Sequence, residues 1–170
     1  MELFEYKGIM PQISKDAYVQ EGVKICGDVK VGAGSTIWYN STLRGDTASI
    51  TIGENTSIQE LSTVHVDTDY PVEIGSNVTI GHNCIIHGAT IADNVLVGMG
   101  AILLNGCKIP KNCMIGAGAL VTQNSVFEEG MLILGSPAKA IRPLKEADYD
   151  YIIENAKEYV ELGKEHKNVK

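Results

Sequence analysis

Aliphatic residues recur along this chain every six positions. An amphipathic α-helix would prefer spacings of 3 and 4, and amphipathic strands in a meander would not keep one period through so many turns. The series runs from residue 19 to residue 121, with two longer gaps and one single-residue slip. Its seventeen members are Val19, Ile25, Val31, Ile37, Leu43, Ile52, Ile58, Val64, Ile74, Ile80, Ile86, Ile91, Val97, Leu103, Ile109, Ile115 and Val121. Such a series indicates internal structural repeats.

Small residues stand four positions after most of these aliphatic residues, and glycine often follows them directly, as at Gly32, Gly53 and Gly75. We interpret each unit as one flat side of a triangular coil, with the aliphatic side chain inside and the small residue at the corner. We expect the glycines to provide sharp turns with positive φ. The pattern predicts a left-handed parallel β-helix of the hexapeptide-repeat class, about six coils tall.

Two gaps and a different C-terminal pattern complete the predicted organisation. Three extra residues fall around positions 46–49 and four around 67–70, and both insertions leave the same side of the prism. From residue 147 to about 166, apolar residues at spacings of 3 and 4 predict one helix packed along the prism. These residues are Ala147, Tyr151, Ile152, Ala156, Tyr159, Val160 and Leu162. We expect one domain, with the β-helix in 1–143 (repeats at about 19–126) and the helix and tail in 144–170.

Composition excludes several classes of partner. The chain has 170 residues, with 14 Lys and Arg against 21 Asp and Glu, a net charge of −7. No basic cluster is present, so we do not expect nucleic-acid binding. No apolar run approaches the roughly 20 residues of a membrane span, and the N-terminus does not resemble a signal peptide. We therefore expect a cytoplasmic protein with no membrane partner.

The four cysteines are predicted to be structural. Cys84, Cys107 and Cys113 occupy the small-residue position of their repeats, and Cys26 does not. No Cys-x-x-Cys spacing that would indicate a metal site or redox motif is present. We expect free, mostly inward-facing thiols.

Three of the four histidines occupy informative positions in the repeats. His65 follows Val64 and His87 follows Ile86 on the same side of the prism, one coil apart. Arg44 takes the same position one coil earlier. The two histidine rings are therefore predicted to stack at about the spacing of neighbouring strands, roughly 4.8 Å, where both can reach one metal ion.

The third histidine, His82, lies around a corner from this column. A flat-sided prism readily forms a closed threefold oligomer, in which His82 of one chain can join His65 and His87 of its neighbour. Three histidines with an open fourth position form the ligand set of a catalytic zinc. Solvent-facing histidines without metal are the alternative that spacing leaves open. His166, in the charged tail, is predicted to have no functional role.

These residues resemble the γ-class carbonic anhydrases, from about residue 10 through the C-terminal helix. The matching motifs are an Arg-x-Asp, a Gln six residues before a His, and a His-x4-His-Gly. Here they read Arg44-Gly45-Asp46, Gln59 with His65, and His82-Asn83-Cys84-Ile85-Ile86-His87-Gly88. The segment Gly135-Ser136-Pro137-Ala138-Lys139 is less specific, because acyltransferases of the same fold share it.

The resemblance implies that His65, His82 and His87 bind Zn²⁺, with Fe²⁺ or Co²⁺ possible, between subunits of a homotrimer. It further implies that Gln59 orients the metal-bound water and that Tyr159, on the C-terminal helix, overlooks the site.

The same resemblance implies that Arg44 and Asp46 form an ion pair across subunits, with Arg44 also holding a bicarbonate oxygen. The implied reaction is reversible hydration of carbon dioxide to bicarbonate by a metal-bound hydroxide.

The sequence departs from the best-known members beside the predicted metal site. Thr47 stands in place of a Glu, and Glu60 and Leu61 replace an Asp and an Asn. The loop after His65 is short; its Asp67 and Asp69 are candidates for a proton relay or for ordinary turn residues. The sequence thus supports metal binding more strongly than fast turnover.

Two other functions remain open at this point. An acyl-CoA-dependent acyltransferase would use the same scaffold with one histidine as general base and no metal. A catalytically weak metal-binding homologue would serve as an assembly scaffold.

Overall fold

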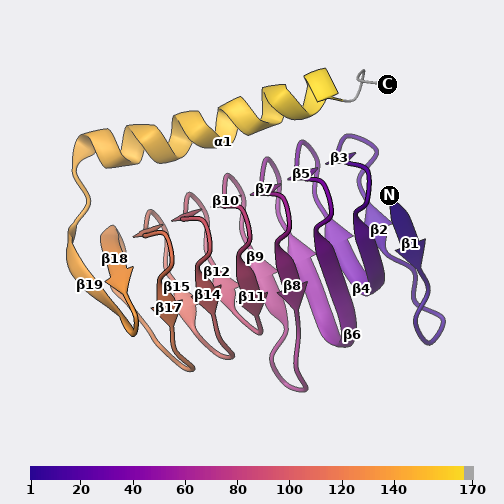
Figure 1. Ribbon diagram of the computed structural model, residues 1–170, viewed down its shortest axis with the longest axis horizontal. Helices are drawn as coiled ribbons and strands as arrows, with labels where there is room; N and C mark the ends of the chain where they lie inside the picture. The colour runs from indigo at the N-terminus through magenta and orange to yellow at the C-terminus, as the bar shows by residue number, and fades with distance from the viewer. Residues whose placement is uncertain (167–170) are drawn as a thin grey trace.

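The computed structural model describes residues 1–166 and is a left-handed parallel β-helix with one helix along its side (Figure 1). One sheet has 11 strands, which are β1 (Glu2–Phe4), β2 (Gln12–Ile13), β4 (Lys24–Val31), β6 (Thr42–Ile52), β8 (Thr63–His65), β9 (Val72–Ile74), β11 (Ile85–His87), β12 (Thr90–Ile91), β14 (Ile102–Leu103), β15 (Lys108–Ile109) and β17 (Leu120–Val121). The other has 8, which are β3 (Tyr18–Val19), β5 (Thr36–Ile37), β7 (Ser57–Ile58), β10 (Thr79–Ile80), β13 (Leu96–Val97), β16 (Met114–Ile115), β18 (Met131–Gly135) and β19 (Ala138–Pro143).

The six-residue period places its aliphatic residues inside the coil, as predicted. Ile37 pairs with Ile58, Ile58 with Ile80, and Ile80 with Val97, so equivalent residues stack from coil to coil. Nearly all of the series is buried, and Cys84, Cys107 and Cys113 fill the small corner positions with no exposure. The 8-stranded sheet has seven parallel strands, β3, β5, β7, β10, β13, β16 and β18, one for each coil. The solenoid is therefore one coil taller than predicted.

The glycines that follow the aliphatic residues have a different role from the predicted one. Gly32, Gly53 and Gly75 do not have positive φ. A Cβ on each would instead lie within 2.4–2.7 Å of the next coil. Stacking at strand spacing leaves no room for a side chain there. Positive φ occurs instead at the tight corners, at asparagines such as Asn40 (60°) and Asn94 (55°) and at other glycines such as Gly100 (70°).

The two insertions take different forms. Residues 46–49 do not leave the solenoid as a loop, because β6 runs unbroken through them and β4 pairs with it across a register shift between Gly27 and Val29. Residues 67–70 do form a projecting turn, which an antiparallel bridge between Asp67 and Tyr70 closes. This turn lies beside the histidine column.

Helix α1 (Glu146–His166) confirms the predicted helix and runs back along the prism toward the N-terminal coils (Figure 1). It contacts β5, β7 and β10 through a narrow stripe of buried residues, Ile152, Ala156 and Gly163. Two of the apolar residues whose spacing predicted the helix do not face the prism, since Ala147 is exposed and Tyr151 is 57% exposed. They lie outside that stripe.

Gly163 allows the helix to approach the sheet closely. A Cβ there would lie 2.5 Å from Cγ2 of Thr36 and 3.1 Å from Tyr18. Within residues 1–166, no helix is long and apolar enough to cross a bilayer.

Candidate metal centre

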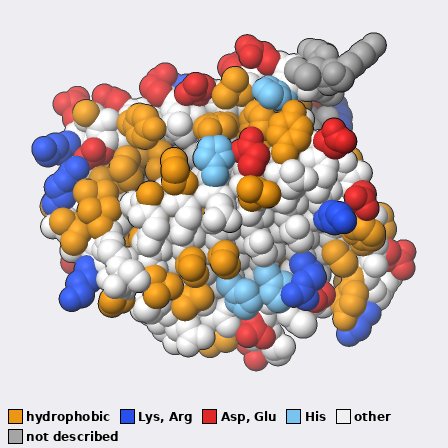
Figure 2. Space-filling model, viewed as in Figure 1, with side chains coloured by type: hydrophobic (Ala, Val, Ile, Leu, Met, Phe, Trp, Pro, Cys, Tyr) orange, Lys and Arg blue, Asp and Glu red, His pale blue; other side chains and the backbone are white. Residues whose placement is uncertain are grey.

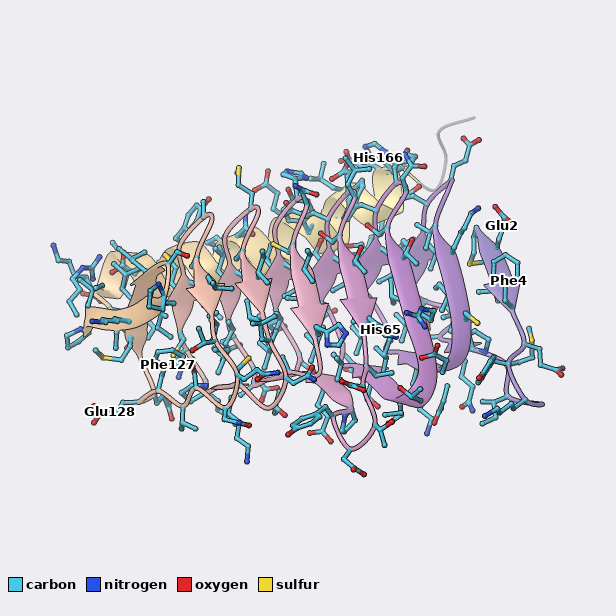
Figure 3. All side chains as sticks on the ribbon, turned by 60° about the horizontal axis from the view of Figure 1, so that its bottom comes forward. Glu2, Phe4, His65, Phe127, Glu128 and His166 are labelled. Atoms are coloured by element: carbon cyan, nitrogen blue, oxygen red, sulfur yellow. The ribbon has the colours of Figure 1, made fainter. Side chains whose placement is uncertain are left out.

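The predicted column forms on the 11-stranded sheet. Arg44 of β6 pairs in register with His65 of β8, and His65 pairs with His87 of β11. Cys26 extends the same column by one coil below Arg44. The alternation of the strands directs Leu43, Val64 and Ile86 inward, and so directs their successors outward. Figure 3 shows His65 on the outer surface of the solenoid, well apart from His166 at the end of α1.

The two histidine rings of the column are in direct contact. Nδ1 of His65 lies 2.9 Å from Nε2 of His87, and the ring centroids are 4.8 Å apart. The remaining nitrogens have acceptors as partners. Nδ1 of His87 lies 2.6 Å from Oδ1 of Asn105, and Nε2 of His65 lies 3.2 Å from Oδ1 of Asp46.

The number of hydrogens available to the contacts of the two rings favours a cation between them. Three contacts join Asn105, His87, His65 and Asp46, and each needs one hydrogen. Two neutral imidazoles carry only two. If His87 donates to Asn105 and His65 donates to Asp46, two lone pairs face each other with nothing between them. Either a third proton or a metal ion satisfies that contact.

Electrostatics disfavour the third proton on His65. Partial burial lowers the pKa of His65, and the neighbouring Arg44 charge adds to this, although the hydrogen bond to Asp46 acts in the opposite direction. For Asp46, desolvation acts to raise the pKa, but hydrogen bonds from His65 and Arg44 bring it below its usual value. His65 therefore favours its neutral form near pH 7, and a neutral ring can offer a nitrogen to a metal.

The distance between the two facing ring nitrogens fits the binding of one metal ion by both. Two nitrogens bound to one tetrahedral zinc at about 2.0–2.1 Å lie roughly 3.3 Å apart, and the pair here is at 2.9 Å. Each ring also has an oxygen partner on its other nitrogen, an arrangement typical of metal-binding histidines.

Arg44 pairs with Asp46 of the same chain. The guanidinium side chain remains 50% exposed, whereas the carboxylate is 14% exposed. The pair expected across subunits thus exists within one chain, and contact with a neighbouring subunit stays a prediction.

The third histidine lies at a separate place, as predicted. His82 occupies a corner turn between β10 and β11, and its Nδ1 lies 2.7 Å from Oε2 of Glu60, in the corner turn one coil below. Figure 2 shows two adjacent histidine side chains beside a basic one, and another histidine beside an acidic side chain nearer the helix. Among residues 1–166, no three His, Cys, Asp or Glu side chains lie close enough to hold a metal.

Gln59 and Tyr159 lie on the helix side of that corner. Gln59 is only 5% exposed. Burial raises the pKa of Tyr159, as do the charges of Glu60 and Glu158, while hydrogen bonding with Gln59 opposes the rise. The phenol therefore stays protonated at neutral pH. Its ring packs edge-on against Trp38, with centroids 5.7 Å apart.

One chain thus carries two separate groups of predicted site residues. We call the first the column half-site, which contains Arg44, Asp46, His65 and His87. We call the second the corner half-site, which contains Gln59, Glu60, His82 and Tyr159. Neither half-site holds three metal ligands.

Sequence reasoning missed two contacts of the histidines. Asn105 was not considered, although it stands third in a repeat one coil after His87, a position from which it can reach that ring. His166 was expected to have no role, but its Nδ1 lies 3.1 Å from the hydroxyl of Tyr39 and its ring packs on Trp38. It anchors the end of α1.

Comparisons with known proteins agree with the repeats and with the resemblance to carbonic anhydrases. Residues 88–123 match the family model described as bacterial transferase hexapeptide (six repeats). The chain is 39% identical to the carbonic anhydrase of Geobacillus kaustophilus, over 97% of this chain and 91% of that one. It is 47% identical to the "Probable carbonic anhydrase" of Methanocaldococcus jannaschii, over 89% and 95%.

A plant relative is longer. Gamma carbonic anhydrase 2, mitochondrial, of Arabidopsis thaliana is 42% identical over 92% of this chain, but the chain spans only 58% of that protein.

Two solved structures superpose closely. One is a hexapeptide transferase family protein from Anaplasma phagocytophilum, with a TM-score of 0.93, 36% identity and 96% of each chain covered. The other is a "putative acetyltransferase" from Bacillus cereus, with a TM-score of 0.98 and 37% identity over 99% of this chain and 98% of that one.

Proposed function

Since this chain belongs to the γ-class carbonic anhydrase family, we propose that it catalyses reversible hydration of carbon dioxide to bicarbonate with a divalent metal held between subunits of a homotrimer. The observation that carries the proposal is the pair of imidazole nitrogens, Nδ1 of His65 and Nε2 of His87, that face each other at 2.9 Å. His82 of a neighbouring chain would supply the third ligand.

The donor set suits Zn²⁺, and Fe²⁺ or Co²⁺ would also accept imidazole ligands. When bound, such a cation lowers the pKa of water in contact with it toward neutrality, which is the chemistry that carbon dioxide hydration needs. The contact of Glu60 with His82 supports a role of His82 as a metal ligand. The Glu60 carboxylate hydrogen-bonds Nδ1 of His82, so that this contact leaves Nε2 for a metal.

The other residues would orient the reactants. Gln59 would hydrogen-bond the attacking water, and the protonated hydroxyl of Tyr159 would help to hold Gln59 in place. Arg44 has donors that Asp46 does not use, so it would hold an oxygen of bicarbonate. Asp46 would accept the Nε2 proton of His65 and fix the orientation of that ring.

The surface around His82 supports a subunit interface. Leu61 is 60% exposed, Ile85 41% and Met99 59%. Leu61 and Met99 lie in the corner turns before and after that of His82, and Ile85 begins the next strand. Exposed apolar side chains gathered in one region are typical of contact surfaces. The proposed trimer would cover this region.

The first test measures metal per chain in protein purified without chelator, followed by stopped-flow carbon dioxide hydration on the same sample. We expect one metal per chain and turnover that chelation abolishes. His82→Ala should lose both metal and turnover, whereas the matched control His166→Ala should keep both. Full metal content in His82→Ala would contradict the proposal, and metal without turnover would favour a scaffold.

An acyl-CoA-dependent acyltransferase is the second candidate, because the matching family model and both solved structures carry transferase names. Saturable acetyl-CoA binding by metal-free protein, unaffected by His82→Ala, would favour it. A cytoplasmic location remains part of our proposal.

A further inference from the structure

A line of side chains leads from His87 to the projecting turn. Oδ1 of Asn105 lies 2.6 Å from Nδ1 of His87, and Nδ2 of Asn105 donates to Oδ2 of Asp67 at 3.0 Å. The other oxygen of Asp67 accepts a hydrogen bond from the backbone N–H of Thr68 at 2.8 Å. Both carboxylate oxygens are therefore engaged.

The direction of these bonds is determined from the Asp67 end. An ionised carboxylate only accepts hydrogen bonds. Asn105 must therefore turn its amide nitrogen toward Asp67 and its carbonyl oxygen toward His87. A carbonyl oxygen also only accepts, so Nδ1 of His87 must carry the proton. Nε2, which faces His65, is left with a free lone pair.

The backbone around Asn105 is shaped to hold this arrangement. Gly88 follows His87 and has φ of +59°. A Cβ there would lie 2.5 Å from Oδ1 of Asn105 and 2.7 Å from Cβ of Tyr70. Glycine thus allows both the amide and the 67–70 turn to come against the coil. Asn105 itself is only 8% exposed, which limits competition from water.

We propose that Asn105 and Asp67 are positioning residues that hold His87 in its Nδ1–H tautomer, so that Nε2 is presented as a metal ligand. Asp67 acts through Asn105, and the four-residue insertion at 67–70 exists to deliver its carboxylate. This inference rests on the proposed function for its purpose, but the tautomer can be tested without metal. It also gives Asp67 a role other than the proton relay considered from the sequence.

Asp67→Asn is the test variant, because it keeps the shape of the side chain and changes one acceptor into a donor. Its oxygen would remain on the N–H of Thr68 and its amide nitrogen would face Asn105. Asn105 would then turn over and donate to Nδ1 of His87. We expect the ring to shift from the Nδ1–H to the Nε2–H tautomer, seen in long-range ¹H–¹⁵N spectra of metal-free protein at alkaline pH.

Zinc competition with a chromophoric chelator provides the second measurement. Loss of an outer partner of a metal-binding histidine weakens metal affinity about 10–100-fold, and we expect that loss in Asp67→Asn. Asp69→Asn is the matched control, since it removes the same charge from the same turn. Asp69 has φ of +67°, which asparagine also tolerates, so both readouts should match the wild type.

The double variant Asp67→Asn with Asn105→Asp should restore both properties. The carboxylate at position 105 would accept from His87 and from the amide at position 67, so every bond has its hydrogen again. If the turn had a purely structural role, exchanging the two groups would not restore the tautomer or the zinc affinity. Recovery in the double variant would therefore also exclude poor folding as the cause of the effects of Asp67→Asn.

The outcomes separate the two proposals. An unchanged tautomer and unchanged zinc affinity in Asp67→Asn overturn the positioning role, even if the wild type binds metal and is active. A tautomer that responds to Asp67→Asn in a wild-type protein that binds no metal supports the hydrogen-bond line and overturns the proposed metal centre. Failure of the double variant to recover either readout contradicts the inference.

Discussion

At the scale of single residues, Leu61 is the most unusual backbone position beside the site. Its φ is +61°, in the left-handed region where a leucine is disfavoured. The corresponding turns of neighbouring coils have Asn40, Asn83, Gly100 and Gly118 in the same conformation. The Leu61 side chain is 60% exposed.

Leu61→Asn should therefore stabilise the isolated chain. The left-handed conformation costs an ordinary residue about 1–2 kcal/mol, and asparagine avoids part of that cost, so we expect a gain of up to about 1 kcal/mol. Urea unfolding at low protein concentration measures it. Asn83→Leu, one coil later, is the reverse control and should destabilise. A loss of stability in Leu61→Asn would mean that Leu61 is packed against a partner in the assembly.

Residue-scale features differ in how far the sequence predicts them. The register of Arg44, His65 and His87 follows from the six-residue period of the sequence, because each coil repeats the structure of the previous one. The partners of their rings do not follow, because Asn105 and Asp67 are 38 positions apart and meet only after the 67–70 turn folds back. The glycines were misassigned because close packing and positive φ both select glycine.

At the scale of elements, the start of α1 depends on one carboxylate. Oδ2 of Asp148 accepts hydrogen bonds from Nη1 of Arg142 at 2.7 Å and from the backbone N–H of Lys145 at 2.8 Å. Lys145 directly precedes the helix, so Asp148 closes its first turn in the manner of a capping box. The hydrogen bond from Arg142 and the one from the backbone of Lys145 lower the pKa of Asp148.

This lowered pKa predicts a defined dependence of stability on pH. The folded protein binds the proton of Asp148 less readily than the unfolded chain, whose ordinary value is 3.8. The contribution of Asp148 is thus fully present above that pH and is lost as pH falls through the lower folded pKa. Asp148→Asn should lower the thermal midpoint at neutral pH, and the difference from wild type should shrink in acid.

Asp150→Asn removes the same charge two residues along the same helix and is the control. It should change the midpoint less than Asp148→Asn at neutral pH. A difference between Asp148→Asn and wild type that grew in acid would contradict the assigned hydrogen bonds.

The limits of this helix were predictable, but its buried face was only partly so. Apolar spacing located α1 to within one residue at its start. It could not show that Ala147 and Tyr151 stay outside the stripe that meets β5, β7 and β10. That stripe passes through Gly163, whose place against Thr36 depends on the shape of the sheet. The hydrophobic pattern of the sequence does not identify a glycine that is needed because the helix backbone lies close to the sheet.

At the scale of the whole molecule, the proposed metal centre needs both half-sites, which lie apart within one chain. The column half-site has His65 and His87, and the corner half-site has His82 with Gln59 and Tyr159. In a closed threefold assembly every chain can use its column half-site with one neighbour and its corner half-site with the other. Each trimer would then hold three equivalent sites.

This arrangement predicts complementation between two inactive variants. His82→Ala keeps an intact column half-site, and His87→Ala keeps an intact corner half-site, so neither forms a complete site alone. Co-expressed with different affinity tags, they should form mixed trimers with one complete site each. Tandem purification followed by metal analysis should find about one metal per mixed trimer, with chelator-sensitive hydration in proportion.

The control for complementation is a pair of variants that damage the same half-site. Mixed trimers of His65→Ala and His87→Ala contain no intact column half-site and should hold no metal at this centre. If instead each site were built within one chain, the first pair would fail to complement just as the second does. A centre shared between chains predicts that metal and activity return in the first pair alone. Only mixed trimers of that pair bring an intact column half-site together with an intact corner half-site.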